Sequence, residues 1–105
     1  MTTTLKIAQV EGGAGGNGLL VDTVASVTLA DTRIRVYTYA VTAASEIVIG
    51  DSKGPVIKQP VLAANTGDSV YIGDDGIRCK GNVSVTGAST DGILYVYYGL
   101  SLWTL

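Results

Sequence analysis

Apolar and polar residues alternate with a period of two along most of this chain, a pattern typical of strands with one buried face. The clearest run spans residues 33–40, where successive side chains should face opposite sides of a sheet. One face of that run is predicted to hold Ile34, Val36, Thr38 and Ala40. The other is predicted to hold Arg33, Arg35, Tyr37 and Tyr39. No segment shows a convincing helical period of 3.6 residues, so the pattern predicts an all-β protein.

Similar runs predict further short strands, separated by residues that favour turns. The predicted strands are residues 5–10, 24–29, 33–40, 46–49, 56–62, 70–72, 77–79, 83–86 and 93–98. Gly and Asp are concentrated between them, and residues 12–18 form a Gly-rich loop. Short strands at intervals of about 8–12 residues predict an antiparallel β-sandwich or barrel of about seven to nine strands. Residues 1–105 are predicted to form a single domain.

Composition limits the partners that such a domain can have. Apolar residues make up 47% of the 105-residue chain and charged residues only 15%, against a usual charged share of roughly 25%. A surface so poor in charge is typical of one that partners cover. The net charge is −2 and no basic run exists, so we expect no nucleic-acid binding. No apolar run is long enough to cross a bilayer and no signal peptide is visible, so we expect cytoplasmic synthesis and no membrane partner.

The residues that enzymes commonly use for catalysis are scarce. The chain has no His, which removes the usual general base and the commonest metal ligand. The single Cys79 excludes an internal disulfide and is interpreted as a small apolar strand residue. Asp51, Asp68, Asp74, Asp75 and Asp91 lie in turn signals, which explains each of them without a substrate. We therefore predict no enzyme activity, no cofactor and no metal site.

Aromatic residues and the C-terminal tail are the candidates for interaction. Tyr37 and Tyr39 are predicted on one strand face, and Tyr97 on the last strand; a phenol offers contact area together with a polar group. Residues 100–105 alternate apolar and polar residues and would be adhesive if exposed, so we expect them either to add a last strand to the sheet or to dock on a neighbouring subunit. The predicted interface residues are Leu100, Leu102, Trp103, Leu105, Tyr37, Tyr39 and Tyr97.

Residues 67–99 resemble the C-terminal half of small β-sheet virion proteins of tailed bacteriophages. The resemblance is carried by GDSVYI at 67–72, DGIR at 75–78, GNVSVTGA at 81–88 and ILYVYY at 93–98. It implies a structural component of the virion. The first expectation is a capsid cement or decoration protein, a homotrimer bound to the major capsid protein at the surface of the phage head. A head–tail connector or tail component is the alternative within the same class.

Two hypotheses from other classes stay open. The tyrosines would also suit a carbohydrate-binding or receptor-binding β module, because aromatic rings stack on sugars. A small hydrolase would need two carboxylates facing each other across a cleft. The three hypotheses differ in what they require of the surface: an apolar contact area, an aromatic hollow, or a pair of acids.

Overall fold

A computed structural model describes residues 6–10, 18–61, 63–73, 75–87 and 93–99. These residues contain no helix, and their regular structure is entirely β. The strands are β1 (Lys6–Val10), β2 (Gly18–Asp22), β3 (Arg33–Val41), β4 (Ser45–Asp51), β5 (Gly54–Val61), β6 (Thr66–Tyr71), β7 (Ile77–Arg78), β8 (Ser84–Thr86) and β9 (Ile93–Gly99). The prediction of an all-β protein built from short strands is confirmed.

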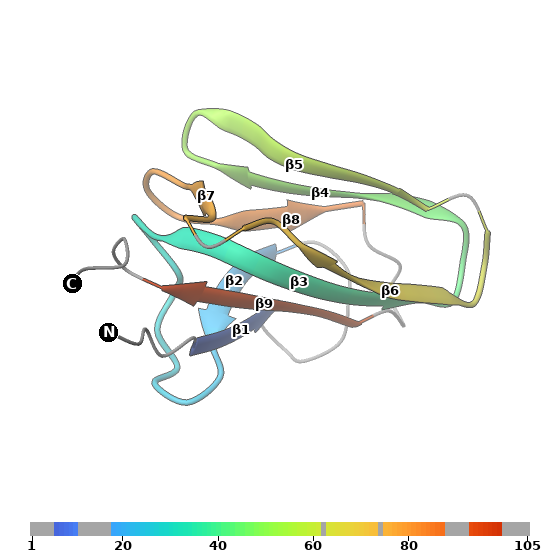
Figure 1. The fold of residues 1–105 in the computed structure, drawn as a ribbon, viewed down its shortest axis with the longest axis horizontal. Coiled ribbons are helices and arrows are strands. Elements are labelled where there is room, and N and C mark those ends of the chain that lie inside the picture. The colour runs from blue at the N-terminus through green and yellow to red at the C-terminus, as the bar shows by residue number, and fades with distance from the viewer. Residues whose placement is uncertain (1–5, 11–17, 62, 74, 88–92, 100–105) are drawn as a thin grey trace.

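The strands form one antiparallel sheet that is nearly closed into a barrel. Their order is β5-β4-β8-β2-β1-β9-β3-β6, and β7 pairs separately with the start of β3. Figure 1 shows the sheet curling back toward itself, with β3, β6 and β9 in front of β8 and β2. Strands β5 and β6 end the order and are therefore the edge strands.

The interior of the barrel is filled by side chains from both halves of the sheet. The aliphatic core consists of Ala8, Val10, Leu20, Leu29, Ile34, Val41, Ile47, Ile49, Ile57, Val61, Val83, Val85, Leu94 and Val96. Tyr37 and Tyr39 lie among them, with ring centroids 6.4 Å apart. The Tyr37 hydroxyl donates a hydrogen bond of 2.6 Å to Gln59 Oε1. Because Gln59 is in the edge strand β5 and Tyr37 is in β3, next to the other edge strand, this bond joins the two sides of the nearly closed barrel.

A bulge in β3 changes which of its residues face inward. The register between β3 and β9 shifts between Ile34 and Val36, so Arg35 is the extra residue. Ile34 and Arg35 are both buried, whereas Arg33 and Val36 are half-buried. The predicted faces of the 33–40 run are therefore wrong at its start, because a bulge inserts one residue and interrupts the alternation. As a result of the bulge, Arg33 lies on the outer face together with Val36.

The second predicted strand, at residues 24–29, is also wrong. The strand lies earlier, at Gly18–Asp22, and residues 23–25 form a turn. The turn forms because Asp22 Oδ1 accepts hydrogen bonds from the backbone N–H groups of Val24 (2.8 Å) and Ala25 (2.7 Å). The remainder of the predicted run contributes only an isolated bridge from Thr28 to β2.

A glycine turn holds β7 against β3. Gly76 donates to Gly73 O at 3.2 Å and has a φ of +68°. A Cβ atom at Gly76 would lie 2.6 Å from Ile34 O, so a side chain there would have to displace the β3 backbone. This tight turn brings Arg78 directly opposite Arg33.

Candidate functional site

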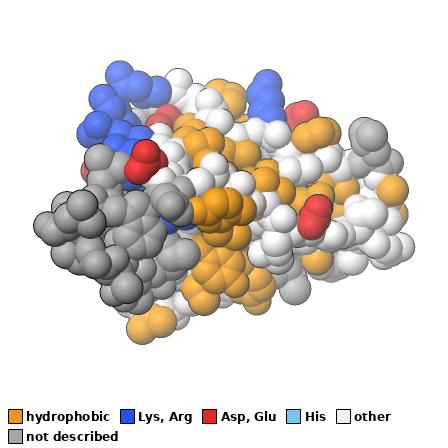
Figure 2. Space-filling view, viewed as in Figure 1, with side chains coloured by type: hydrophobic (Ala, Val, Ile, Leu, Met, Phe, Trp, Pro, Cys, Tyr) orange, Lys and Arg blue, Asp and Glu red, His pale blue; other side chains and the backbone are white. Residues whose placement is uncertain are grey.

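The outer face of β1, β9, β3 and β6 carries a row of apolar side chains. The register places Ile7 opposite Tyr97, Tyr97 opposite Val36, and Val36 opposite Tyr71. Val24 continues the row, because it lines the same hollow as Ile7. Val24 is 93% exposed and Tyr71 is 63% exposed. These five residues are named the apolar belt, and Figure 2 shows hydrophobic side chains gathered in a band across this face.

Two further rows flank the apolar belt. One is uncharged, and it consists of Tyr95 together with the polar residues Gln9, Thr38 and Ser69. Within it, the Thr38 and Ser69 hydroxyl oxygens are hydrogen-bonded at 2.8 Å. The row on the other side is basic, because β7 sets Arg78 opposite Arg33. The residues of the three rows include no Asp or Glu.

The edge strand β6 has an acid that occupies one of its free backbone donors. Ile72 N–H donates to Arg35 O at 2.7 Å, so by alternation the Ser69 N–H points away from β3. That group donates instead to Asp68 Oδ1 at 2.8 Å. Since unpaired edge groups invite strand addition by another chain, Asp68 blocks part of this edge.

The edge strand β5 is protected by prolines. Pro55 and Pro60 have no N–H to offer another strand. The Gln59 side-chain amide donates to Pro60 O at 3.1 Å, which occupies an acceptor of the same strand. Exposed Lys58 adds a charge between the prolines. With both edges protected, the outer face of the sheet is the surface best suited to contact a partner.

Asp22 fixes the turn that carries Val24. Besides accepting the two turn N–H groups through Oδ1, its carboxylate accepts a hydrogen bond from the Tyr98 hydroxyl through Oδ2. The Ala25 N–H and the Tyr98 hydroxyl, together with nearby Lys6, hold the pKa of Asp22 below its usual range. Burial and the Asp22 carboxylate raise the pKa of Tyr98. Tyr98 of β9 therefore holds the turn in place through Asp22, and the turn presents Val24 to solvent.

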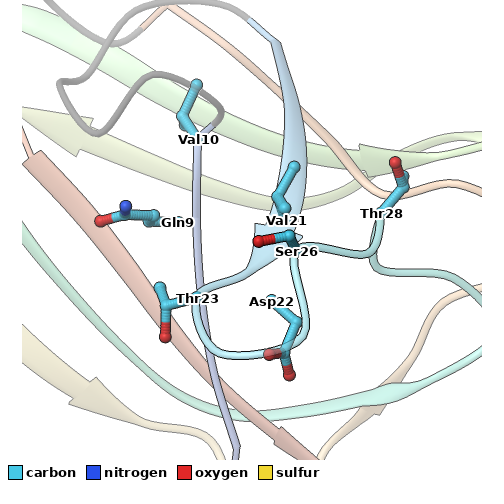
Figure 3. Close-up of a pocket in the computed structure, with 7 residues that line it drawn as sticks. All are labelled: Gln9, Val10, Val21, Asp22, Thr23, Ser26 and Thr28. Atoms are coloured by element: carbon cyan, nitrogen blue, oxygen red, sulfur yellow. The ribbon is translucent and has the colours of Figure 1, made fainter.

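Open hollows lie around this turn. One of about 320 Å³ is lined by Gln9, Val10, Val21, Asp22, Thr23, Ser26 and Thr28 (Figure 3). Among the described residues of that lining, Asp22 is the one carboxylate, and its two oxygens already accept hydrogen bonds. The described part of the lining therefore offers hydroxyl and amide groups, and it holds no pair of carboxylates of the kind that a glycosidase uses. Among the described residues, no group of three or more His, Cys, Asp or Glu could hold a metal ion.

The structure describes some of the aspartates that were predicted to lie in turns. Asp51 Oδ1 accepts from Lys53 N–H, and Asp51 Oδ2 accepts from Lys80 N–H, each at 2.8 Å. These backbone hydrogen bonds lower the pKa of Asp51. Asp51 thus ties the β4–β5 hairpin to the segment after β7, which is a structural role. Asp74 and Asp91 lie outside the described residues.

Cys79 is a core residue. It is fully buried, and its N–H donates to Thr32 O at 2.7 Å. Burial, with a contribution from Asp51, raises the pKa of the thiol to about 11. The interpretation of Cys79 as a small apolar residue agrees with this environment, and the neighbouring bases do not activate it.

We expect the Cys79 thiol to react with a disulfide reagent such as DTNB only when the protein opens. At pH 8 the folded protein should react at least about 1,000-fold more slowly than in guanidinium chloride, because the thiolate is scarce and the sulfur is inaccessible. The absorbance of the released thiol measures both rates. Rapid stoichiometric labelling of the folded protein would show that the site is open.

The predicted interface residues fall into three groups. Tyr37 and Tyr39 are only 3% and 9% exposed, so they belong to the core, and the expectation that they form a contact surface is corrected. Tyr97 lies in the apolar belt. Leu100, Leu102, Trp103 and Leu105 lie outside the described residues, as does most of the Gly-rich loop. Sequence reasoning missed the rest of the apolar belt, because only the register places its members side by side.

Comparison of the chain with protein-family models, curated proteins and solved structures finds no match. In the part of the chain that the structure describes, no helix has the length and apolar character needed to cross a membrane. The surface itself is therefore the basis for assigning a function.

Proposed function

We propose that this chain is a non-enzymatic structural protein that binds other proteins through the outer face of β1, β9, β3 and β6. Its proposed location is the bacteriophage virion, at the surface of the capsid. There it acts as a cement or decoration protein, a homotrimer that binds the major capsid protein and stabilises the assembled head. The apolar belt is the observation that carries this proposal.

The exposure and continuity of the apolar belt support protein binding. Contiguous apolar patches on a small protein commonly mark interaction sites, whereas single exposed apolar residues need no explanation. The apolar belt crosses four strands and ends on the fixed turn at Val24. Protected edges at β5 and β6 favour contact through the face over strand addition. The resemblance of residues 67–99 to phage virion proteins supports the choice of a phage head; a head–tail connector or tail component is the alternative with the same support.

Shells assembled without this protein provide the test. We expect the purified chain to have a mass in light scattering of three times its 10.8 kDa, to cosediment with such shells, and to raise their melting temperature. Truncation of residues 100–105 should weaken trimer formation or shell binding. A monomer that leaves the shells unoccupied would contradict the proposal.

A carbohydrate-binding module is the second candidate, and one hollow favours it. This hollow of about 380 Å³ is lined by Ile7, Gln9, Thr23, Tyr95 and Tyr97. Two phenols with an amide and a hydroxyl are groups that can stack on a sugar and hydrogen-bond it. Glycan-array binding that is lost in Tyr95→Ala would support this candidate, and an array without any bound glycan would argue against it.

A further inference from the structure

The pair of arginines beside the apolar belt has a cost that the fold does not explain. In the antiparallel pairing of β3 with β7, Arg33 lies directly opposite Arg78. Like charges in directly opposite positions destabilise a strand pair. Arg33 Nη1 is held by Asp75 O at 3.3 Å, which is a neutral acceptor, and the Arg78 side chain is exposed. A local cost of this kind is expected where a residue serves a function.

The position of the pair relates it to the proposed contact surface. The bulge at Arg35 turns Arg33 to the outer face, and the Gly76 turn delivers Arg78 to the same face. In the register, Arg33 pairs with the last residue of β9, Gly99, which is two positions beyond Tyr97 of the apolar belt. Lys and Arg side chains gather at the end of the molecule that contains β7, and acidic side chains lie beside them (Figure 2). The three rows of this face are therefore apolar at the centre, basic on one side, and uncharged on the other.

We infer that this face recognises a folded protein surface with an apolar centre and carboxylate groups on the side that meets Arg33 and Arg78. The inference rests on the proposed function, and it names the chemistry of the partner. Charge complementarity selects this partner, because the three rows carry two guanidinium groups and no acid. Guanidinium groups bind carboxylates in a planar, two-bond geometry, and a partner carboxylate would relieve the repulsion between the two arginines. Such contacts fix orientation and raise the rate of association.

A small probe that combines the two features tests the face without the virion. 1-Anilinonaphthalene-8-sulfonate has an apolar aromatic body and one anionic group, while N-phenyl-1-naphthylamine has a similar body and no charge. We expect the sulfonate to shift the amide NMR signals of the apolar belt and of β7. Arg33→Gln combined with Arg78→Gln should weaken its binding at least about fivefold, an effect of roughly 1 kcal/mol. The neutral probe should bind the variant and the unchanged protein about equally.

Lys58→Gln is the matched control, because it removes one exposed positive charge from β5, at the other end of the strand order. Arg78→Gln alone provides a variant that keeps the Arg33–Asp75 hydrogen bond, and melting temperatures verify that each variant is folded. The inference is wrong if Lys58→Gln weakens binding of the sulfonate as much as Arg78→Gln does. It is also wrong if the shifted NMR signals lie outside the apolar belt and β7. With shells, binding of the unchanged protein should weaken in 0.5 M NaCl, and binding of the double variant should change much less. Shells that stay unoccupied while the probe maps to the face would contradict the virion function and leave the surface assignment standing.

Discussion

Asp22→Ala is expected to lower the free energy of unfolding by about 3 kcal/mol, the largest effect of a single substitution that we predict for stability. The Asp22 side chain is 6% exposed and accepts hydrogen bonds from Val24 N–H, Ala25 N–H and the Tyr98 hydroxyl. A hydrogen bond to a charged group contributes about 1.5–3 kcal/mol, and a buried hydroxyl left without a partner adds a further penalty. The bonds from Val24 N–H and Ala25 N–H are only partly buried, so water can replace Asp22 there, and the total stays near the loss of the Tyr98 bond with its penalty. Urea unfolding followed by tyrosine and tryptophan fluorescence measures the change, and the melting temperature should fall by roughly 15 °C.

Two further variants separate the turn from the core contact. Tyr98→Phe removes only the hydroxyl, and we expect it to cost about half as much as Asp22→Ala. In a double-mutant cycle, the combined variant should be clearly less destabilised than the sum of the two single variants, because both remove the same bond. Additive effects would show that Asp22 and Tyr98 act independently, contrary to the geometry.

The pH dependence of stability tests whether the charged form of Asp22 stabilises the fold. The pKa of Asp22 is lowered in the folded state, so its stabilisation is complete above the unfolded-state pKa of about 4 and is lost as pH falls through the folded-state value. Asp22→Asn keeps the size of the side chain but does not titrate. The difference in unfolding free energy between the unchanged protein and Asp22→Asn should therefore shrink below about pH 4. A difference that stays constant from pH 7 to pH 3 would contradict the assignment.

The alternation of residues was sufficient to predict the fold class, because half-buried strands impose a period of two over every short run. It failed where a local polar interaction or an inserted residue interrupts the period. Residues 24–29 alternate like a strand, yet the Asp22 carboxylate binds the N–H groups of Val24 and Ala25 and turns the chain. An Asp whose carboxylate can accept from the N–H groups two and three residues further on is a weak signal for such a turn. The bulge at Arg35 left no signal that we recognised in the sequence.

The candidate site was less predictable than the fold, because it depends on register. Ile7, Val36 and Tyr71 are ordinary outward residues of three separate strands, and nothing local distinguishes them. They form one row only after β1, β9, β3 and β6 are placed in order and aligned. For the tyrosines of the 33–40 run the error was the opposite one, because core residues were predicted to lie on the surface. Tyr37 was predicted as a contact residue, and it instead donates a hydrogen bond to Gln59 on the inner side of the sheet.

Tyr97→Ser is expected to weaken binding to shells by about 30-fold or more while lowering the melting temperature by only a few degrees, because it removes cross-strand packing but no core side chain. Tyr97 lies in the middle of the apolar belt, between Ile7 and Val36, and its half-buried ring faces outward. Aromatic residues at the centre of an interface often contribute 2 kcal/mol or more, which corresponds to a factor of about 30 in affinity. Cosedimentation with shells over a range of protein concentrations measures the affinity of each variant.

Tyr95→Ser is the matched control, because Tyr95 lies on the same strand and the same face, two residues away, in the polar row. It removes the same kind of side chain. If the contact is centred on the apolar belt, Tyr95→Ser should lower the affinity for shells much less than Tyr97→Ser does. A sugar bound in the hollow between the two rings would need both of them, since both line it. Equal losses in the two variants would therefore place the contact in that hollow and contradict the apolar belt as its centre. A loss confined to Tyr97→Ser, with glycan binding absent, would identify the apolar belt as the docking surface.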